Sequence, residues 1–156
     1  MSFWDFIIIF FAQYLGWVLG IFLLFFVWLK KREGVFIVGE TLTATIVSRF
    51  GLTEIIRYFY DKPRPFEGLE GAKQLIEHEA GGSFPSGNAA FFFAIATTLF
   101  IYNRRWGVVF FVAAILMGAA RVFANLHWPI DILGGAAVGI ISSLLAHFLA
   151  KKFKKS

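Results

Sequence analysis

The sequence of 156 residues contains no cysteine, only three histidines and few charged residues. Without cysteine, the chain can form neither a disulfide framework nor a thiolate metal site. Charged residues make up 16% of the chain and hydrophobic residues 58%, whereas a soluble domain carries about 25% charged residues. The mean hydropathy is +0.71. The composition therefore predicts an integral membrane protein.

The positive charge of the chain is concentrated beside its apolar stretches. The formal net charge is +5 at pH 7, and nine of the fifteen basic residues lie in three groups, at 30–32, 104–105 and 151–155. Short basic flanks of this kind set the orientation of membrane spans and attract anionic lipid headgroups. We therefore expect these residues to face a bilayer rather than a nucleic acid.

Five apolar stretches approach or exceed the roughly 20 residues that a membrane span needs. They predict an all-α, polytopic bundle of about five transmembrane helices, at about 6–29, 35–60, 86–102, 106–125 and 129–150. With the basic groups in the cytoplasm, the N-terminus lies outside and the C-terminus inside. The loops 61–85 and 125–128 then lie outside. Apolar residues at helical spacing predict a short surface helix over 69–80 in the longer loop.

We expect the first apolar stretch to remain in the mature protein. Asp5 precedes it instead of a basic region, it is longer than the apolar part of a signal peptide, and it lacks a small-residue cleavage site. No internal repeat, linker or low-complexity segment divides the chain. The sequence therefore predicts one integral-membrane domain over residues 1–156.

Charged residues within or at the ends of spans are costly and mark candidate functional positions. With the expected topology, the second span ends outside at Arg57, shortly before Arg64, and the third begins outside at Ser86. The fourth ends outside at Arg121, shortly before His127, and the fifth begins there. Distant segments thus converge on one membrane face. The charged residues of the spans are Glu40, Arg49, Glu54, Arg57, Arg121 and Asp131.

This set of residues suits phosphate chemistry. Guanidinium groups match phosphate oxygens, and the N–H groups of the Ser86-Gly87 helix start form an anion site that the helix dipole reinforces. Asp131, four residues beyond His127, can hydrogen-bond one ring nitrogen and leave the other free to attack phosphorus. Phosphoryl transfer spreads charge over the phosphate oxygens, so three arginines and backbone donors can catalyse it without a metal.

Three motifs carry a resemblance to a known family. The pattern Arg57-x6-Arg64-Pro65, then Pro85-Ser86-Gly87-Asn88, then Arg121-x5-His127-x3-Asp131 resembles the signature of the type-2 phosphatidic acid phosphatase superfamily, also called lipid phosphate phosphatases. The motifs cover residues 57–131, about half the chain. The resemblance implies a membrane-embedded helical enzyme that needs no metal or cofactor. It would remove phosphate from lipid phosphates or diphosphates through a phosphohistidine.

The resemblance also implies a role for each residue of the motifs. His127 would be the nucleophile and Asp131 would orient it. The phosphate would be held by Arg57, Arg64, Arg121, Ser86 and the Gly87 amide. Members of the family usually have six spans, so we expect this chain to lack one peripheral helix.

Three positions depart from the family pattern. Arg57 replaces a lysine and keeps its charge, and Ala120 replaces a serine and loses one hydroxyl. Asn88 replaces the histidine that in the family protonates the leaving oxygen. Asparagine cannot act as an acid, and losing a general acid lowers rates by about 10²- to 10⁴-fold.

The chemistry of the leaving group then indicates a substrate class. A lipid monophosphate that leaves from a diphosphate is a weak base, because the second pKa of a phosphate is about 6. Asn88 therefore favours lipid diphosphates such as polyprenyl diphosphate. Phosphatidic acid, phosphatidylglycerophosphate and lipid A phosphates also fit an interfacial site. The oligomeric state stays open.

Alternative functions follow from the same residues. A catalytically silent protein could bind lipid phosphate without turnover, because Asn88 cannot act as an acid. A small channel or transporter could use Glu40 and Arg49, although their nine-residue spacing places them on opposite faces of a helix. A vanadate-dependent haloperoxidase shares the motif pattern, but membrane embedding and the missing acid argue against it.

The remaining polar residues have weaker interpretations. Glu54 shares a helix face with Arg57 and is expected to steady it. His78 is a candidate substitute acid if its loop folds over the site. His147 is expected to be a polar packing residue near the cytoplasmic end. Neither Arg49 nor Glu40 has an assigned role.

Overall fold

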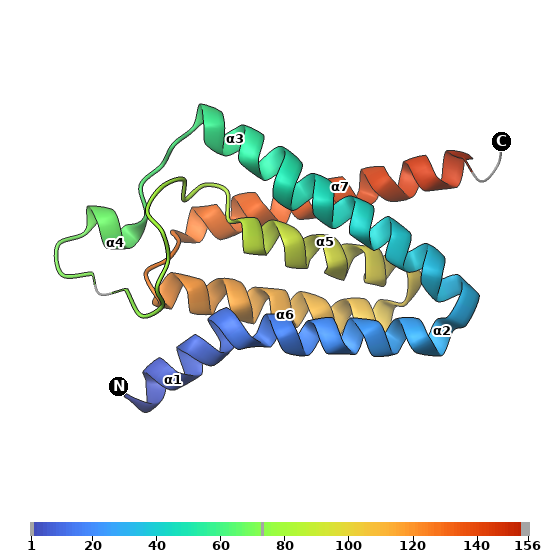
Figure 1. The fold of residues 1–156 in the computed structure, drawn as a ribbon, viewed down its shortest axis with the longest axis horizontal. Coiled ribbons are helices and arrows are strands. Elements are labelled where there is room, and N and C mark those ends of the chain that lie inside the picture. The colour runs from blue at the N-terminus through green and yellow to red at the C-terminus, as the bar shows by residue number, and fades with distance from the viewer. Residues whose placement is uncertain (1, 73, 154–156) are drawn as a thin grey trace.

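The computed structural model describes residues 2–72 and 74–153, and all regular structure in this part of the chain is helical. Two of the helical segments, η1 and η2, are π-helical turns inside longer helices. Figure 1 shows the order of the segments along the chain. They are α1 (Phe3–Ile9), η1 (Phe10–Tyr14), α2 (Leu15–Ile46), η2 (Val47–Leu52), α3 (Thr53–Phe59), α4 (Pro65–Gly68), α5 (Gly87–Tyr102), α6 (Arg104–Phe123) and α7 (Pro129–Phe153).

Helix α5 is the centre of the bundle. It packs against α6, α7, α2 and η2, and most of its side chains are buried. Helix α2 turns back near its middle, so its first half lies along α6 and its second half leads up to α3 (Figure 1). The core residues gather around α5: Leu19, Ile37, Ala89, Phe92, Phe93, Ile95, Ala96, Leu99, Phe110, Ala113, Ala114 and Met117.

Two glycines of α7 let it approach α5 closely. A Cβ atom at Gly135 would lie 2.3 Å from the carbonyl oxygen of Ser86, and one at Gly139 would lie 2.3 Å from that of Ala90. Small residues four apart allow such backbone contact between membrane helices. The contact holds the start of α5 against the start of α7, where the Ser86 amide donates to the Asp131 carbonyl at 2.9 Å.

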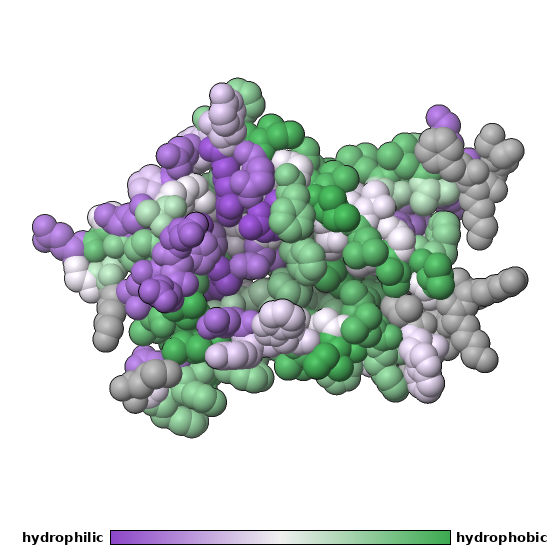
Figure 2. All heavy atoms as spheres, viewed as in Figure 1, coloured by the Kyte–Doolittle hydropathy of each residue, from purple (hydrophilic) through white to green (hydrophobic). Residues whose placement is uncertain are grey.

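The outer surface of the bundle is apolar, as a lipid environment requires. Large side chains such as Trp17, Leu24 and Leu133 are exposed. Within the described residues, four helical stretches are long and apolar enough to cross a membrane, at Phe3–Phe25, Gly34–Phe59, Arg104–Phe123 and Pro129–Lys152. Figure 2 shows hydrophobic atoms over the middle of the molecule and hydrophilic atoms at the end that carries the long loop. The protein is an integral membrane helix bundle, as the sequence predicts.

The third predicted span is α5, which is shorter than the other four. Its 16 residues rise about 24 Å, less than the roughly 30 Å of a hydrocarbon core. Neighbouring helices surround it, so α5 does not need to match the membrane thickness along a lipid-facing side. Its short length leaves the Ser86 end recessed under the loop before it.

The two ends of the bundle differ as the sequence predicts. The N-terminus and the loop between α3 and α5 lie at one end, and the middle of α2, the start of α6 and the end of α7 lie at the other (Figure 1). Lys151 and Lys152 are in the last turn of α7. The last part of the predicted basic tail, residues 154–156, lies outside the described residues.

The surface helix predicted over 69–80 is wrong. The loop instead has one helical turn, α4, which Pro65 begins and Glu67 caps by accepting a 2.8 Å hydrogen bond from the Arg64 amide. Gly71 has a φ of 79°, a left-handed conformation that ends helical structure. The following segment folds back over the end of the bundle instead of lying as a helix on the membrane surface.

Candidate phosphate site

Three loops meet at the end of the bundle that carries the N-terminus. The Ser83 amide donates to the Lys62 carbonyl at 2.8 Å. Arg64 Nη1 donates to the Leu126 carbonyl at 3.0 Å, and Trp128 Nε1 donates to the Pro63 carbonyl at 3.0 Å. The loops that carry Arg64 and His127 therefore meet at one end of the bundle, as the sequence predicts.

His127 lies at the bottom of this site with only 2% of its surface exposed. Its Nδ1 is 3.1 Å from the Ser83 carbonyl, and because a carbonyl only accepts, Nδ1 carries the ring proton. Nε2 is then unprotonated, and it lies 3.4 Å from Arg64 Nη1. Burial lowers the pKa of His127 to about 4, so the ring is neutral near pH 7. Its Nε2 lone pair is available as a nucleophile.

Asp131 contacts His127 differently from the sequence prediction. Its Oδ2 is 3.7 Å from Nδ1, which is too far for a hydrogen bond. The carboxylate accepts instead from Lys62 Nζ at 2.8 Å, from the Trp128 amide at 2.8 Å and from Ser83 Oγ. The predicted hydrogen bond to His127 is therefore wrong. Asp131 acts on the histidine through its charge and through Ser83, whose carbonyl receives the ring proton.

Lys62 and Ser83 are site residues that sequence reasoning missed. Both lie in the loop between α3 and α5, where polar residues usually face solvent. Lys62 also lies over the Trp128 ring, with Nζ 5.5 Å from its centre. Only the folded loop reveals that both residues point at a carboxylate from another helix.

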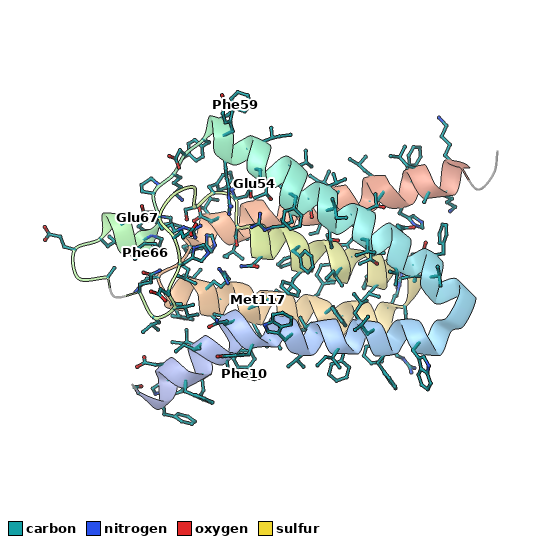
Figure 3. The ribbon with its side chains drawn as sticks, in the orientation of Figure 1. Phe10, Glu54, Phe59, Phe66, Glu67 and Met117 are labelled. Carbon is teal, nitrogen blue, oxygen red and sulfur yellow. The ribbon has the colours of Figure 1, made fainter. Side chains whose placement is uncertain are left out.

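Arg57 and Arg64 both donate to carbonyl groups of the loop that precedes α5. Arg57 donates to the Pro85 carbonyl from Nε at 3.3 Å and from Nη2 at 3.0 Å. Its Nη1 is 3.2 Å from Glu54, which confirms the predicted contact between these two residues. Arg64 Nε donates to the Gly81 carbonyl at 3.0 Å. Figure 3 shows Glu54 on α3, above the start of α5.

Arg49, which the sequence left unassigned, belongs to the same site. It lies in η2, and π-helical turns often occur at functional sites. Its Nη1 is 2.6 Å from Glu54. A Cβ atom at Gly87 would lie 2.6 Å from Arg49 Nε, so the guanidinium covers the N-terminus of α5. The sequence signal was a charged residue within a span, and it did not show where that charge pointed.

These arginines line one open hollow with a volume of about 550 Å³. Its wall includes Arg49, Arg57, Arg64 and His78, together with the acidic groups Glu54, Asp61 and Glu79. The hollow is at the loop end of the bundle and is large enough for a phosphate or diphosphate group. The predicted loop residue His78 therefore does reach the site.

Ser86 begins α5 and is fully buried. Its Oγ accepts from the Ala89 amide at 3.4 Å, as an N-cap does. The first amides of a helix have no carbonyl partner within it, and the Arg49 guanidinium lies against Gly87 at this end of α5. The predicted anion site at the start of α5 therefore includes the guanidinium of Arg49.

Arg121 and Asn88 pair with each other on the other side of α5. With the amide turned to satisfy its neighbours, Asn88 Oδ1 accepts from both terminal nitrogens of Arg121 at 2.9 Å. Arg121 Nη1 also donates to the Ala12 carbonyl at 3.1 Å. Both residues line a mostly apolar groove of about 470 Å³ with Trp17, Phe92 and others. Met117 of α6 also lines this groove, and Figure 3 shows it close to the N-terminal helices.

Glu40 and His147 form a separate polar group at the opposite end of the bundle. Glu40 accepts from the Tyr102 hydroxyl at 2.7 Å and lies 3.0 Å from His147 Nδ1. Glu40 and Arg49 therefore do not pair, as their spacing predicts. In the described residues, no group of three or more His, Cys, Asp or Glu side chains is placed to hold a metal ion.

Comparison with known proteins gives the family of the chain. The sequence profile of the PAP2 superfamily matches residues 37–155. The chain belongs to this superfamily. Undecaprenyl-diphosphatase BcrC of Bacillus subtilis is 31% identical to it over 90% of this chain and 72% of its own. Lipid A 1-phosphatase of Porphyromonas gingivalis is 29% identical over 78% of this chain and 25% of its own.

A solved structure agrees with this assignment. The crystal structure of Aquifex aeolicus LpxE superimposes with a TM-score of 0.78 and 30% identity, over 94% of this chain and 86% of that one. The PAP2 motifs identified in the sequence lie within the matched residues. The protein is therefore a membrane-embedded lipid phosphatase.

Proposed function

We propose that this PAP2 enzyme removes the terminal phosphate of polyprenyl diphosphates through a phosphohistidine on His127. The observation that carries the proposal is the neutral His127 ring, with its proton held at Nδ1 by Ser83 and its Nε2 lone pair facing Arg64. A nucleophile needs this tautomer, because the attacking nitrogen must be unprotonated.

The proposed reaction has two steps. His127 Nε2 attacks phosphorus, the bond to the leaving lipid monophosphate breaks, and a phosphohistidine results. Water then attacks phosphorus, the N–P bond breaks, and inorganic phosphate is released. Arg49, Arg57 and Arg64 neutralise the charge on the phosphoryl oxygens, which is the main contribution a protein makes to phosphoryl transfer. Arg121 supports the site from the other side of α5.

Three observations favour a diphosphate substrate. Asn88 pairs with Arg121 and cannot donate a proton, so the acid is missing from its usual position, and a weakly basic leaving group depends least on acid catalysis. Arg49 is a third arginine in the hollow, beside Arg57 and Arg64, and can contact a second phosphate. One relative carries the name undecaprenyl-diphosphatase.

Phosphate release from two lipids tests the proposed substrate class. In detergent, the purified protein is expected to release phosphate from a polyprenyl diphosphate with a kcat/KM at least about tenfold above that for phosphatidic acid, because the diphosphate needs less acid assistance. Equal rates, or a preference for phosphatidic acid, would contradict the diphosphate assignment. Binding of both lipids without any phosphate release would identify a silent lipid-phosphate-binding protein instead.

Replacing Arg49 is expected to affect the diphosphate more than the monophosphate. In Arg49→Gln, we expect KM for polyprenyl diphosphate to rise about tenfold, the effect of one charged hydrogen bond to phosphate, with little change for phosphatidic acid. Steady-state kinetics on both lipids measure the difference. Arg105→Gln, at the opposite end of the bundle, serves as the control, and an equal rise in KM for both lipids would show that Arg49 does not recognise the second phosphate.

We also propose that the site lies on the extracytoplasmic face of a prokaryotic cell membrane. The basic residues at 104–105 and 151–152 lie at the end opposite the site, and such residues favour the cytoplasmic side. The N-terminus and the loop between α3 and α5 would then be outside.

A further inference from the structure

We propose that His78 is the general acid of this enzyme and replaces the histidine that is missing at position 88. The inference rests on the proposed function, because it assigns the proton donor of the same phosphoryl transfer. It goes beyond that function because no residue of the three motifs supplies this proton.

Asn88 cannot do this work. Its amide has no titratable proton, and its oxygen accepts two hydrogen bonds from Arg121 at 2.9 Å. The side chain lines the apolar groove, whereas Arg49, Arg57 and Arg64 line the polar hollow. Position 88 therefore holds Arg121 in place, and the proton must come from another residue.

His78 lines the hollow and lies beside the ring of the nucleophile. The centres of the His78 and His127 rings are 6.5 Å apart, with the rings 78° from parallel. An attacking nitrogen lies about 3–3.5 Å from phosphorus, and a charge-assisted hydrogen bond from an acid to a leaving oxygen is about 2.7–2.9 Å. Both rings are therefore within reach of one phosphoryl group bound beside them, His127 at phosphorus and His78 at the leaving oxygen.

The loop fixes the orientation of the His78 ring. Its Nδ1 is 3.1 Å from the Glu79 carbonyl, which only accepts, so Nδ1 carries a proton and Nε2 is the atom that gains and gives one. Gln74 Nε2 donates to the His78 carbonyl at 2.9 Å and anchors the backbone. Because these hydrogen bonds hold this part of the loop in a non-helical conformation, residues 69–80 do not form the predicted surface helix.

The charges around His78 change when substrate binds. Burial, followed by Arg64 and the more distant Arg121 and Arg57, lowers the pKa of His78. Arg49 from η2, Glu54 from α3, and Asp61 and Glu79 from the loop also line the hollow. A bound phosphate brings negative charge next to the ring, and negative charge favours the protonated form. Substrate binding thus prepares the acid.

The proton follows a closed path. As His127 Nε2 bonds to phosphorus and the bond to the leaving oxygen breaks, the proton on His78 Nε2 moves to that oxygen. In the second step His78 Nε2 takes a proton from the attacking water, the N–P bond breaks, and phosphate leaves. His127 is then neutral and His78 is protonated, as at the start.

The dependence on the leaving group tests this role. His78→Gln is expected to lower kcat on phosphatidic acid by about 10²- to 10⁴-fold, and to lower kcat on polyprenyl diphosphate much less, because its leaving group is a weak base. Glu77→Gln, an exposed change in the same loop, should leave both rates unchanged. Equal losses on both lipids would show that His78 only supports the loop, and would overturn the proposal.

Restoring the family histidine gives a second test. Asn88→His is expected to recover little of the phosphatidic acid turnover lost in His78→Gln, because position 88 lines the apolar groove and not the polar hollow. If Asn88→His raised phosphatidic acid turnover equally in the original protein and in His78→Gln, His78 would not be the proton donor. A chain that cleaves the diphosphate but not phosphatidic acid would also overturn the proposal, since a working acid allows an alkoxide to leave.

The outcomes separate this inference from the proposed function. If the unmodified protein releases phosphate from neither lipid, or if His127→Ala releases it equally well, the proposed function fails. If turnover depends on His127 and His78→Gln leaves both lipids unaffected, only the acid assignment fails.

Discussion

His127→Ala is expected to lower phosphate release from polyprenyl diphosphate by on the order of 10⁶-fold, the loss that removal of a hydrolase nucleophile produces. The reason is geometric. The Ser83 carbonyl fixes the proton on Nδ1, and burial holds the pKa of the ring at about 4, so Nε2 is unprotonated throughout the neutral range. This nitrogen lies 3.4 Å from Nη1 of Arg64, which lines the hollow.

Acid-quench labelling measures the same step directly. Substrate labelled in the terminal phosphate should leave an acid-labile, base-stable label on the protein, and the label should be absent from His127→Ala. His147→Gln changes a histidine at the opposite end of the bundle and should keep both label and turnover. Thermal unfolding of His127→Ala in detergent distinguishes a lost nucleophile from a lost fold. If His127→Ala turned over substrate within tenfold of the rate of the original protein, the phosphohistidine mechanism would be wrong.

The sequence predicted the framework of this molecule because membrane spans leave a strong signal. Runs of about 20 apolar residues can only be helices in a bilayer, and the basic residues between them show which ends lie together. Once the ends were assigned, Arg57, Arg64, Arg121 and His127 had to meet near one face. The long loop was less predictable. Its apolar residues have helical spacing, but the positive φ of Gly71 and the hydrogen bond from Gln74 to the His78 carbonyl hold this segment in a non-helical conformation.

The partners within the site could not be predicted in the same way. Spacing alone suggested that Asp131 would bond His127, but the turn before α7 leaves them 3.7 Å apart and places Ser83 between them. The contacts of Arg49 were also not predictable. Its position in a span marked it as unusual, but only the folded structure shows that its side chain lies against Gly87. Contacts between loops depend on tertiary packing, which local pattern does not encode.

Arg64→Ala is expected to lower kcat by about 10³- to 10⁵-fold, the range for an arginine that stabilises a transferring phosphoryl group. Only 4% of the Arg64 surface is exposed, and its guanidinium spans the site. It donates to the Gly81 and Leu126 carbonyls and reaches His127 Nε2. One side chain thus joins the loop that carries His78 to the loop that carries the nucleophile.

Arg64→Lys separates the charge of this residue from its shape. Lysine keeps the positive charge but has no planar fork, so it cannot hold both carbonyls and a phosphate oxygen together. We expect most of the kcat loss to remain in Arg64→Lys, whereas its KM should be closer to that of the original protein than the KM of Arg64→Ala is. Full recovery of kcat would mean that charge alone matters, and that the bridge between the two loops contributes nothing to catalysis. Arg105→Lys, at the other end of the bundle, should change neither constant.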